Sequence, residues 1–261
     1  MKLNFLIIGI LAIGLYSCGD TEEILEEVNS GLINNPNEQE IEFEAIIEAI
    51  DKDETLREGK SLFYSRDDGA TEEVTLFVND SNVTVKIHHE FTSPNALSLS
   101  SNTYHFSEGT MIASKELFEE GTLEEGHFVE RKTYYNNDEK PIVTKIRIAP
   151  YEDHLEFEQF SIVEKHALSY QKPLNILNQK GEFETTFQGF IEEKPYLYMI
   201  VGDNKAGGYY SSLVVQYMTP FIKKMQINEI EMKGVQLSID FEISNGDQGY
   251  VYQLLMGVRK T

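Results

Sequence analysis

Hydrophobic and polar residues alternate along much of the chain beyond Gly59, with the two-residue period that is typical of β-strands. Val83, Val85 and Ile87, for example, are separated by polar residues and so share one face of a strand. One apolar face and one wet face are typical of antiparallel sheets, and the intervening turns contain Asp, Asn and Gly. We therefore predict an antiparallel meander with strands at residues 61–66, 73–79, 82–91, 102–107, 110–118, 127–136 and 142–149.

A helix is predicted to precede this meander. Asn37 and Glu40 have the spacing of a capping box, in which two side chains satisfy backbone donors at a helix start. Polar residues 51–58 mark its end. Between these limits the apolar residues recur at helical spacing and form one face: Phe43, Ile46, Ile47 and Ile50.

Residues 150–179 break the two-residue period and predict a helical connector. Pro173 suits the first turn of a short helix that stops before Gly181. A strand through Leu155 and Phe157 is the alternative interpretation of the segment that comes before. A first helical face is predicted from Ile162, Val163, His166, Ala167 and Tyr170.

A second small antiparallel β module is predicted after the connector, with strands at residues 183–191, 196–202, 208–217, 235–244 and 249–258. Between its third and fourth strands, Thr219 and Pro220 have the positions of a helix cap and a first helical residue. Three strands, a helix and two strands follow the order of OB-fold barrels. An open sheet and a small sandwich are the alternatives, and the fold class in each case is mainly β.

The first 18 residues predict export. One positive charge at Lys2 is followed by an apolar core at residues 5–15, which has the length of a signal peptide and is too short to span a bilayer. Leu15-Tyr16-Ser17-Cys18 resembles the lipobox of bacterial lipoproteins. That resemblance implies cleavage before Cys18 and lipidation of its sulfur, and two or more acyl chains anchor a protein stably. An ordinary signal peptide that leaves Cys18 as a free thiol is the alternative.

The composition and the net charge limit the classes of binding partner that we expect. The formal net charge is −22 over 261 residues, and a surface so acidic repels nucleic acid and anionic lipid. Cys18 is the only cysteine, so no disulfide forms within one molecule. Hydrophobic residues make up 41% of the chain, enough for a core. The predicted organisation is a signal peptide at 1–17, an acidic tether at 18–40, a helix with the meander at 41–160, and the connector with the second β module at 161–261.

Candidate chemistry is sparse. No nucleophile elbow, zinc-protease helix or phosphate-binding loop is present, and no cofactor is expected. His88, Glu90, His105 and His127 lie on neighbouring predicted strands and are the best candidates for a metal site, although such a scatter arises easily. Eight tyrosines on predicted strands would form either core or a recognition surface: Tyr134, Tyr135, Tyr196, Tyr198, Tyr209, Tyr210, Tyr250 and Tyr252.

These observations favour a non-catalytic lipoprotein of the outer membrane, periplasm-facing or surface-exposed, that binds or assembles with an envelope protein through a sheet face or edge. Its expected membrane contact is the lipid on Cys18. The alternative is a hydrolase or metal-dependent enzyme that uses scattered His, Asp and Glu on a sheet face.

Overall fold

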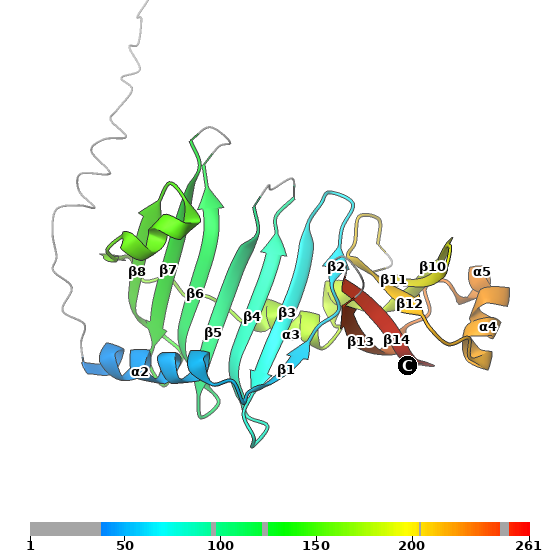
Figure 1. The fold of residues 1–261 in the computed structure, drawn as a ribbon, viewed down its shortest axis with the longest axis horizontal. Helices are drawn as coiled ribbons and strands as arrows, with labels where there is room; N and C mark the ends of the chain where they lie inside the picture. The colour runs from blue at the N-terminus through cyan, green and yellow to red at the C-terminus, as the bar shows by residue number, and fades with distance from the viewer. Residues whose placement is uncertain (1–37, 95–97, 122–124, 204, 246–250) are drawn as a thin grey trace, which may run out of the picture. The chain divides into compact units, whose positions relative to one another are not determined.

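Strands dominate the structure, a computed structural model that describes residues 38–94, 98–121, 125–203, 205–245 and 251–261. Within these ranges, fourteen strands join one mainly antiparallel sheet with an N-terminal helix and a few short helices (Figure 1). The predicted fold class is confirmed. The predicted signal peptide, Cys18 and most of the tether lie outside the described residues. No helix in the described ranges is both long and apolar enough to cross a bilayer.

The predicted meander is present, because each consecutive pair of its strands pairs antiparallel. A three-residue strand, β9 (Ser161–Val163), adds to the last of them. The strands run in sequence order as β3 (Thr71–Val78), β4 (Thr84–Thr92), β5 (Ser100–Ser107), β6 (Thr110–Glu120), β7 (His127–Tyr135) and β8 (Pro141–Ala149).

The predicted strand at residues 61–66 is wrong in detail. The structure has a two-residue strand in this range, β2 (Tyr64–Ser65), and a separate strand just before it, β1 (Arg57–Lys60); both pair with β3. The chain leaves the strand conformation between them so that Leu62 is fully buried, while the Ser61 hydroxyl accepts a hydrogen bond from Val74 N. The pairing of this segment with β3 is therefore interrupted where Leu62 enters the core.

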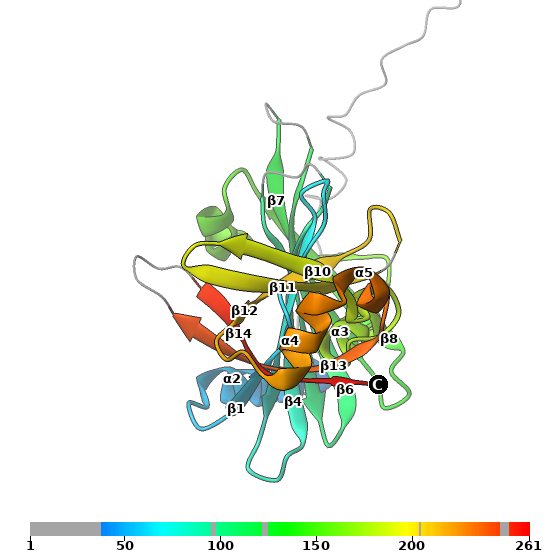
Figure 2. The same ribbon diagram turned by 90° about the vertical axis from the view of Figure 1, so that its right-hand side faces the viewer.

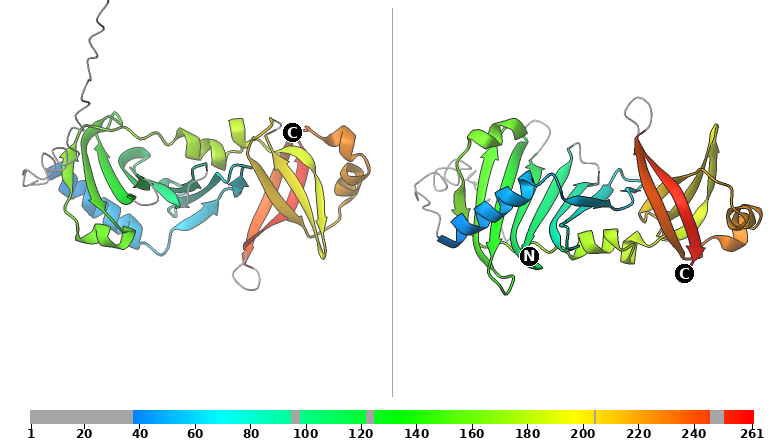
Figure 3. Two further views of the ribbon diagram at one scale, coloured as in Figure 1. Left: turned by 90° about the horizontal axis from the view of Figure 1, so that it is seen from above. Right: turned by 60° about the horizontal axis from the view of Figure 1, so that its bottom comes forward.

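One face of the meander is covered by α2 (Glu38–Lys52), the helix predicted from its apolar spacing. Phe43 and Ile47 pack against Ile112, Ala113 and Tyr134, so this side is called the α2 face (Figures 1 and 3). A 3₁₀ helix, η1 (Glu152–Phe157), also lies on the α2 face, where its buried Leu155 approaches β6, β7 and β8. The alternative strand through Leu155 and Phe157 is therefore wrong.

The opposite side, called the α3 face, carries the main core beneath α3 (Gln171–Leu177) (Figure 3). α3 contains Pro173, as predicted, but the helix predicted over residues 162–170 is wrong. Those residues run as β9 and an irregular segment, because His166 N donates to Thr144 Oγ1 and Leu168 N donates to the Tyr135 hydroxyl. Sheet partners distant in sequence outweigh the local helical spacing.

The five remaining strands bend into a partly closed ring (Figure 3). β12 pairs with β14 in parallel, β14 pairs with β13, and a bridge between Thr186 and Gln236 links β10 to the residue before β13. This order follows the OB-like prediction. The meander is joined to the ring where Tyr210 of β12 pairs with Ser65 of β2. The ring strands are β10 (Thr186–Glu193), β11 (Tyr196–Gly202), β12 (Tyr210–Val215), β13 (Leu237–Asn245) and β14 (Val251–Lys260).

Two short helices connect β12 to β13. α4 (Pro220–Ile227) begins as predicted, with the Thr219 hydroxyl accepting a hydrogen bond from Ile222 N at 3.2 Å. α5 (Glu229–Met232) follows and lies beside β10, where the Glu229 carboxylate accepts from Phe190 N at 2.9 Å (Figure 2). The side chain of Glu229 thereby satisfies a backbone donor of an outer strand.

Candidate binding site

A hollow of about 600 Å³ lies on the α2 face where the meander joins the ring. Its volume falls within the range of small-molecule and side-chain pockets. Side chains from seven strands and the segment between β1 and β2 line it. They are Lys60, Phe63, Ser65, Glu73, Tyr198, Tyr210, Ser211, Ser212, Val214, Ile243, Val251, Tyr252 and Gln253.

The hollow exists because the strands separate at this place. β12 pairs with β2 only through Tyr210 and Ser65, and the last two residues of β12 pair with β14 instead. The Gln253 amide spans the gap, accepting from Phe63 N at 2.7 Å and donating to Ser211 Oγ at 2.9 Å. A side-chain amide thus replaces missing backbone pairing and fixes one wall of the hollow.

Aromatic rings form much of the lining. Tyr198, Tyr210 and Tyr252 line the hollow together with Phe63. At its edge the Tyr196 ring lies 5.6 Å from the Tyr252 ring and 6.1 Å from the Tyr198 ring, measured between centroids. Such contacts hold the rings at defined positions while leaving surface for a ligand.

The other tyrosines of the predicted recognition surface have different environments. Tyr134 lies under α2, where its hydroxyl donates to Glu44. Tyr135 and Tyr209 are buried in the main core on the α3 face. Tyr250 lies outside the described residues. Among the described residues, the tyrosines that remain candidates for the predicted recognition surface are therefore those of the ring.

Glu73 is the half-buried carboxylate of the hollow. Burial raises its pKa, the nearby Lys60 ammonium lowers it, and the Glu90 carboxylate raises it, with a net upward shift. Glu90 stands directly across the β3–β4 ladder from Glu73. Among the described residues, no donor lies within hydrogen-bond distance of the Glu73 carboxylate, and no cation lies within ion-pair distance of it. The negative charge of Glu73 is therefore incompletely compensated.

Of the four predicted metal-site candidates, His88 and Glu90 lie close to each other, while His105 and His127 each lie beside a different carboxylate. His88 Nδ1 lies 2.9 Å from Thr103 Oγ1, with Glu90 3.7 Å from its other ring nitrogen. The side chain of His105 faces α2, and that of His127 is 3.8 Å from a carboxylate at the far end of β6. The described part of the chain contains no group of three His, Cys, Asp or Glu residues suited to a metal ion. The structure therefore brings His88 and Glu90 together but does not gather the four residues into one metal site.

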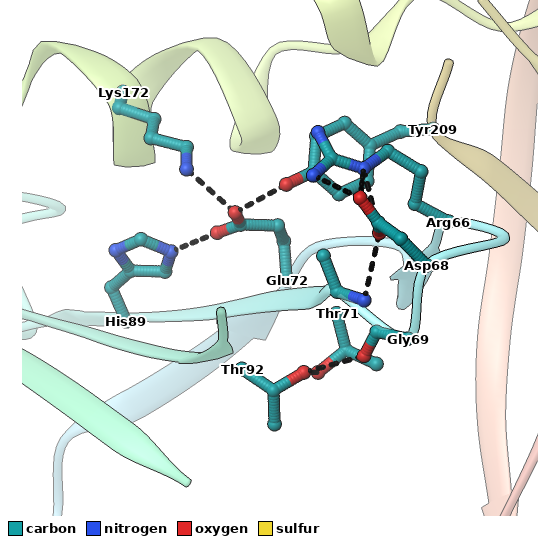
Figure 4. Close-up of polar contacts among 10 residues, drawn as sticks. Arg66, Asp68, Gly69, Thr71, Glu72, His89, Thr92, Lys172 and Tyr209 are labelled. Atoms are coloured by element: carbon teal, nitrogen blue, oxygen red, sulfur yellow. Dashed lines mark hydrogen bonds and ion pairs between the residues drawn. The ribbon is translucent and has the colours of Figure 1, made fainter. Parts of the chain in front are cut away.

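A buried polar cluster on the α3 face was not predicted. Glu72, 2% exposed, accepts hydrogen bonds from His89 Nε2 at 2.6 Å, the Tyr209 hydroxyl at 2.8 Å and Lys172 Nζ at 2.5 Å (Figure 4). We call these four residues the Glu72 cluster. It connects β3, β4, α3 and the residue before β12, so it ties the meander to the ring. Its signal in the sequence is that Glu72 and His89 occupy inward positions of their strands.

The protonation of the Glu72 cluster follows from its contacts. Burial raises the pKa of Glu72, but the hydrogen bonds from His89 and Lys172 outweigh burial and lower it. His89 Nε2 therefore carries a proton, while His89 Nδ1 is buried without a hydrogen-bond partner among the described residues. His89, Glu72 and Tyr209 are buried away from solvent. The cluster therefore holds the meander and the ring together rather than contacting a ligand.

No protein-family model matches this chain, and neither does any curated protein or any solved structure.

Proposed function

We propose that this protein is a non-catalytic, membrane-anchored lipoprotein that binds a protein partner in the cell envelope through the tyrosine-lined hollow. The observation that carries the proposal is the gathering of Tyr198, Tyr210 and Tyr252 around a hollow of about 600 Å³ on an otherwise strongly acidic chain. Tyrosine is enriched at protein interfaces, since its ring supplies contact area and its hydroxyl supplies a hydrogen bond.

The anchor in this proposal is the lipid on Cys18, which follows from the lipobox resemblance. The acidic stretch after Cys18 would hold the folded part away from the anionic membrane surface. The protein would then reside at the outer membrane, facing the periplasm or the exterior. The net charge of −22 supports a protein partner over nucleic acid.

A catalytic function has less support from the described residues. The shortest carboxylate–histidine hydrogen bond among the described residues, between Glu72 and His89 at 2.6 Å, is buried within the Glu72 cluster. A second one, between Asp51 of α2 and His105 at 3.2 Å, has its histidine buried as well. Glu73 in the hollow has no histidine among its neighbours there. A binding role requires only the rings and charges that the hollow presents.

The proposal is tested by photo-crosslinking in cells. A photoreactive phenylalanine analogue at Tyr196, which is 41% exposed at the edge of the hollow, is expected to capture one envelope protein. The same analogue at Tyr151, 62% exposed beside η1, is the matched control and is expected to capture none. Equal capture at both positions, or capture at neither, would contradict the proposal.

A further inference from the structure

The Glu73 carboxylate is the feature of the hollow that requires a ligand of defined charge. A half-buried carboxylate usually accepts several hydrogen bonds, because burying its charge without them is costly. Glu73 lacks such partners among the described residues, and Glu90 across the ladder adds a second negative charge. The hollow is thus preorganised for a positive group that would complete the electrostatic balance.

The Lys60 ammonium compensates part of the negative charge of Glu73. Lys60 is exposed on β1 and lies close enough to lower the pKa of Glu73. The net shift of the Glu73 pKa is nevertheless upward. Among the described residues, no acceptor lies within hydrogen-bond or ion-pair distance of the Lys60 ammonium, and Glu73 is also beyond that distance. A better-placed cation from a ligand would therefore find the carboxylate available.

The aromatic lining suits the same ligand. Tyr198, Tyr210 and Tyr252 surround the space beside Glu73, and the negative face of an aromatic ring attracts a cation. An anionic ligand would be repelled by Glu73 in the lining and by Glu90 across the ladder, and a purely apolar ligand would bury Glu73 further without a partner. A cation on an alkyl stem satisfies both the rings and the carboxylate.

We infer that the hollow binds a lysine or arginine side chain presented by the partner protein, with its charged group on Glu73 and its stem against the tyrosines. This inference rests on the proposed function and specifies the chemistry of the partner. Such a partner also complements the overall charge of −22.

The test uses the full-length protein in detergent, with tyrosine rings labelled with ¹³C and read by NMR. The probe is the capped pentapeptide Gly-Gly-Lys-Gly-Gly, compared with its Arg, Gln and ε-acetyl-lysine analogues at about 0.15 M salt, which screens long-range attraction. The Lys and Arg peptides are expected to shift the ring signals of Tyr198 and Tyr252. The two neutral peptides are expected to bind at least about tenfold more weakly, the scale of one cation–π contact joined to a charged hydrogen bond.

Three variants separate the site from general attraction to an acidic protein. Glu73→Gln is expected to weaken binding of the Lys peptide by about tenfold, whereas Glu42→Gln, which removes the same charge from the exposed face of α2, is expected to leave it unchanged. Lys60→Gln is expected to tighten binding by about threefold, because it removes the competing cation. An increase in affinity cannot result from misfolding, so this variant keeps the test decisive.

Two results would overturn the inference: equal binding of the Lys and Gln peptides, or equal effects of Glu73→Gln and Glu42→Gln. If the peptides fail but photo-crosslinking at Tyr196 still captures an envelope protein, the ligand chemistry is wrong and the binding function stands. If both experiments fail, the binding function itself is wrong.

Discussion

Replacing Glu72 by Gln should destabilise the protein more than any exposed Glu-to-Gln change. Glu72 accepts three hydrogen bonds inside the Glu72 cluster, two of them on Oε1 and one on Oε2. The amide keeps the shape but loses the charge that faces Lys172, and its NH₂ group would meet the protonated His89 Nε2. One strong hydrogen bond is therefore lost and another is weakened.

The magnitude follows from these contacts. A hydrogen bond to a charged group contributes about 1.5–3 kcal/mol, and removing one partner of a buried pair costs about 3–5 kcal/mol. Because the substitution retains one acceptor for Tyr209, we expect a loss of about 3 kcal/mol in the free energy of unfolding. For a folded part of this size, that corresponds to a decrease in Tm of about 6–12 °C. Tyr209→Phe, which removes one hydrogen bond to the same charged carboxylate, should cost about 1.5–3 kcal/mol.

Urea unfolding followed by circular dichroism at pH 7 measures this loss, with Glu42→Gln as the control that should change stability by less than about 0.5 kcal/mol. The pKa of Glu72 is lowered on folding, so its stabilisation is present above the ordinary carboxyl pKa of about 4.3 and is lost as the pH falls further. The difference between wild type and Glu72→Gln should therefore shrink below about pH 4. A loss under about 1 kcal/mol at pH 7, or one that does not diminish in acid, would refute this reasoning.

Three further predictions concern other parts of the chain. Cys18→Ala should move the protein from the detergent phase to the aqueous phase in phase partitioning, and wild type in the aqueous phase would contradict lipidation. Thr219→Ala should lower the free energy of unfolding by about 1 kcal/mol, since Ile222 N loses its acceptor; urea titration measures this, and an unchanged midpoint would contradict it. Gln253→Ala should speed hydrogen exchange at the Phe63 amide, measured by NMR, and cost about 2 kcal/mol; unchanged exchange would show that Gln253 does not hold the junction.

Strands were predictable where the partner strand is a neighbour in sequence. In β4 the two buried residues, Ile87 and His89, lie two apart, which is the strand period that the sequence shows, so the local pattern was sufficient to place this strand. The segment at 161–170 was not predictable in this way. Its helical spacing is genuine, but His166 and Leu168 bond to the side chains of Thr144 and Tyr135, which lie 22 and 33 residues earlier. Tertiary contacts decided its conformation.

The candidate site was predictable only as a set of residue types. Alternation indicated that tyrosines of β11 and β14 were candidates for a wet face, yet the hollow depends on how β12 divides its pairing between β2 and β14. That division pairs Tyr210 with Ser65, 145 residues earlier, and Val214 with Leu254, 40 residues later, and it has no local signature. His89 lies on the same face of β4 as Ile87, and a histidine at such an inward position is itself a sign of a buried polar partner.

The junction between β2, β12 and β14 also has a consequence for the order of folding. The meander requires only contacts between successive hairpins, whereas the Phe63–Gln253 hydrogen bond spans 190 residues and the Glu72–Tyr209 hydrogen bond spans 137. Contacts of such long range carry a larger loop-closure entropy and form slowly. The meander of the nascent chain would thus form early. The edge of the meander at β2 would remain unpaired until β14 has emerged. If the chain is exported, as we propose, this delay is favourable, since the complete sheet forms only after nearly the whole polypeptide has passed through the translocation channel.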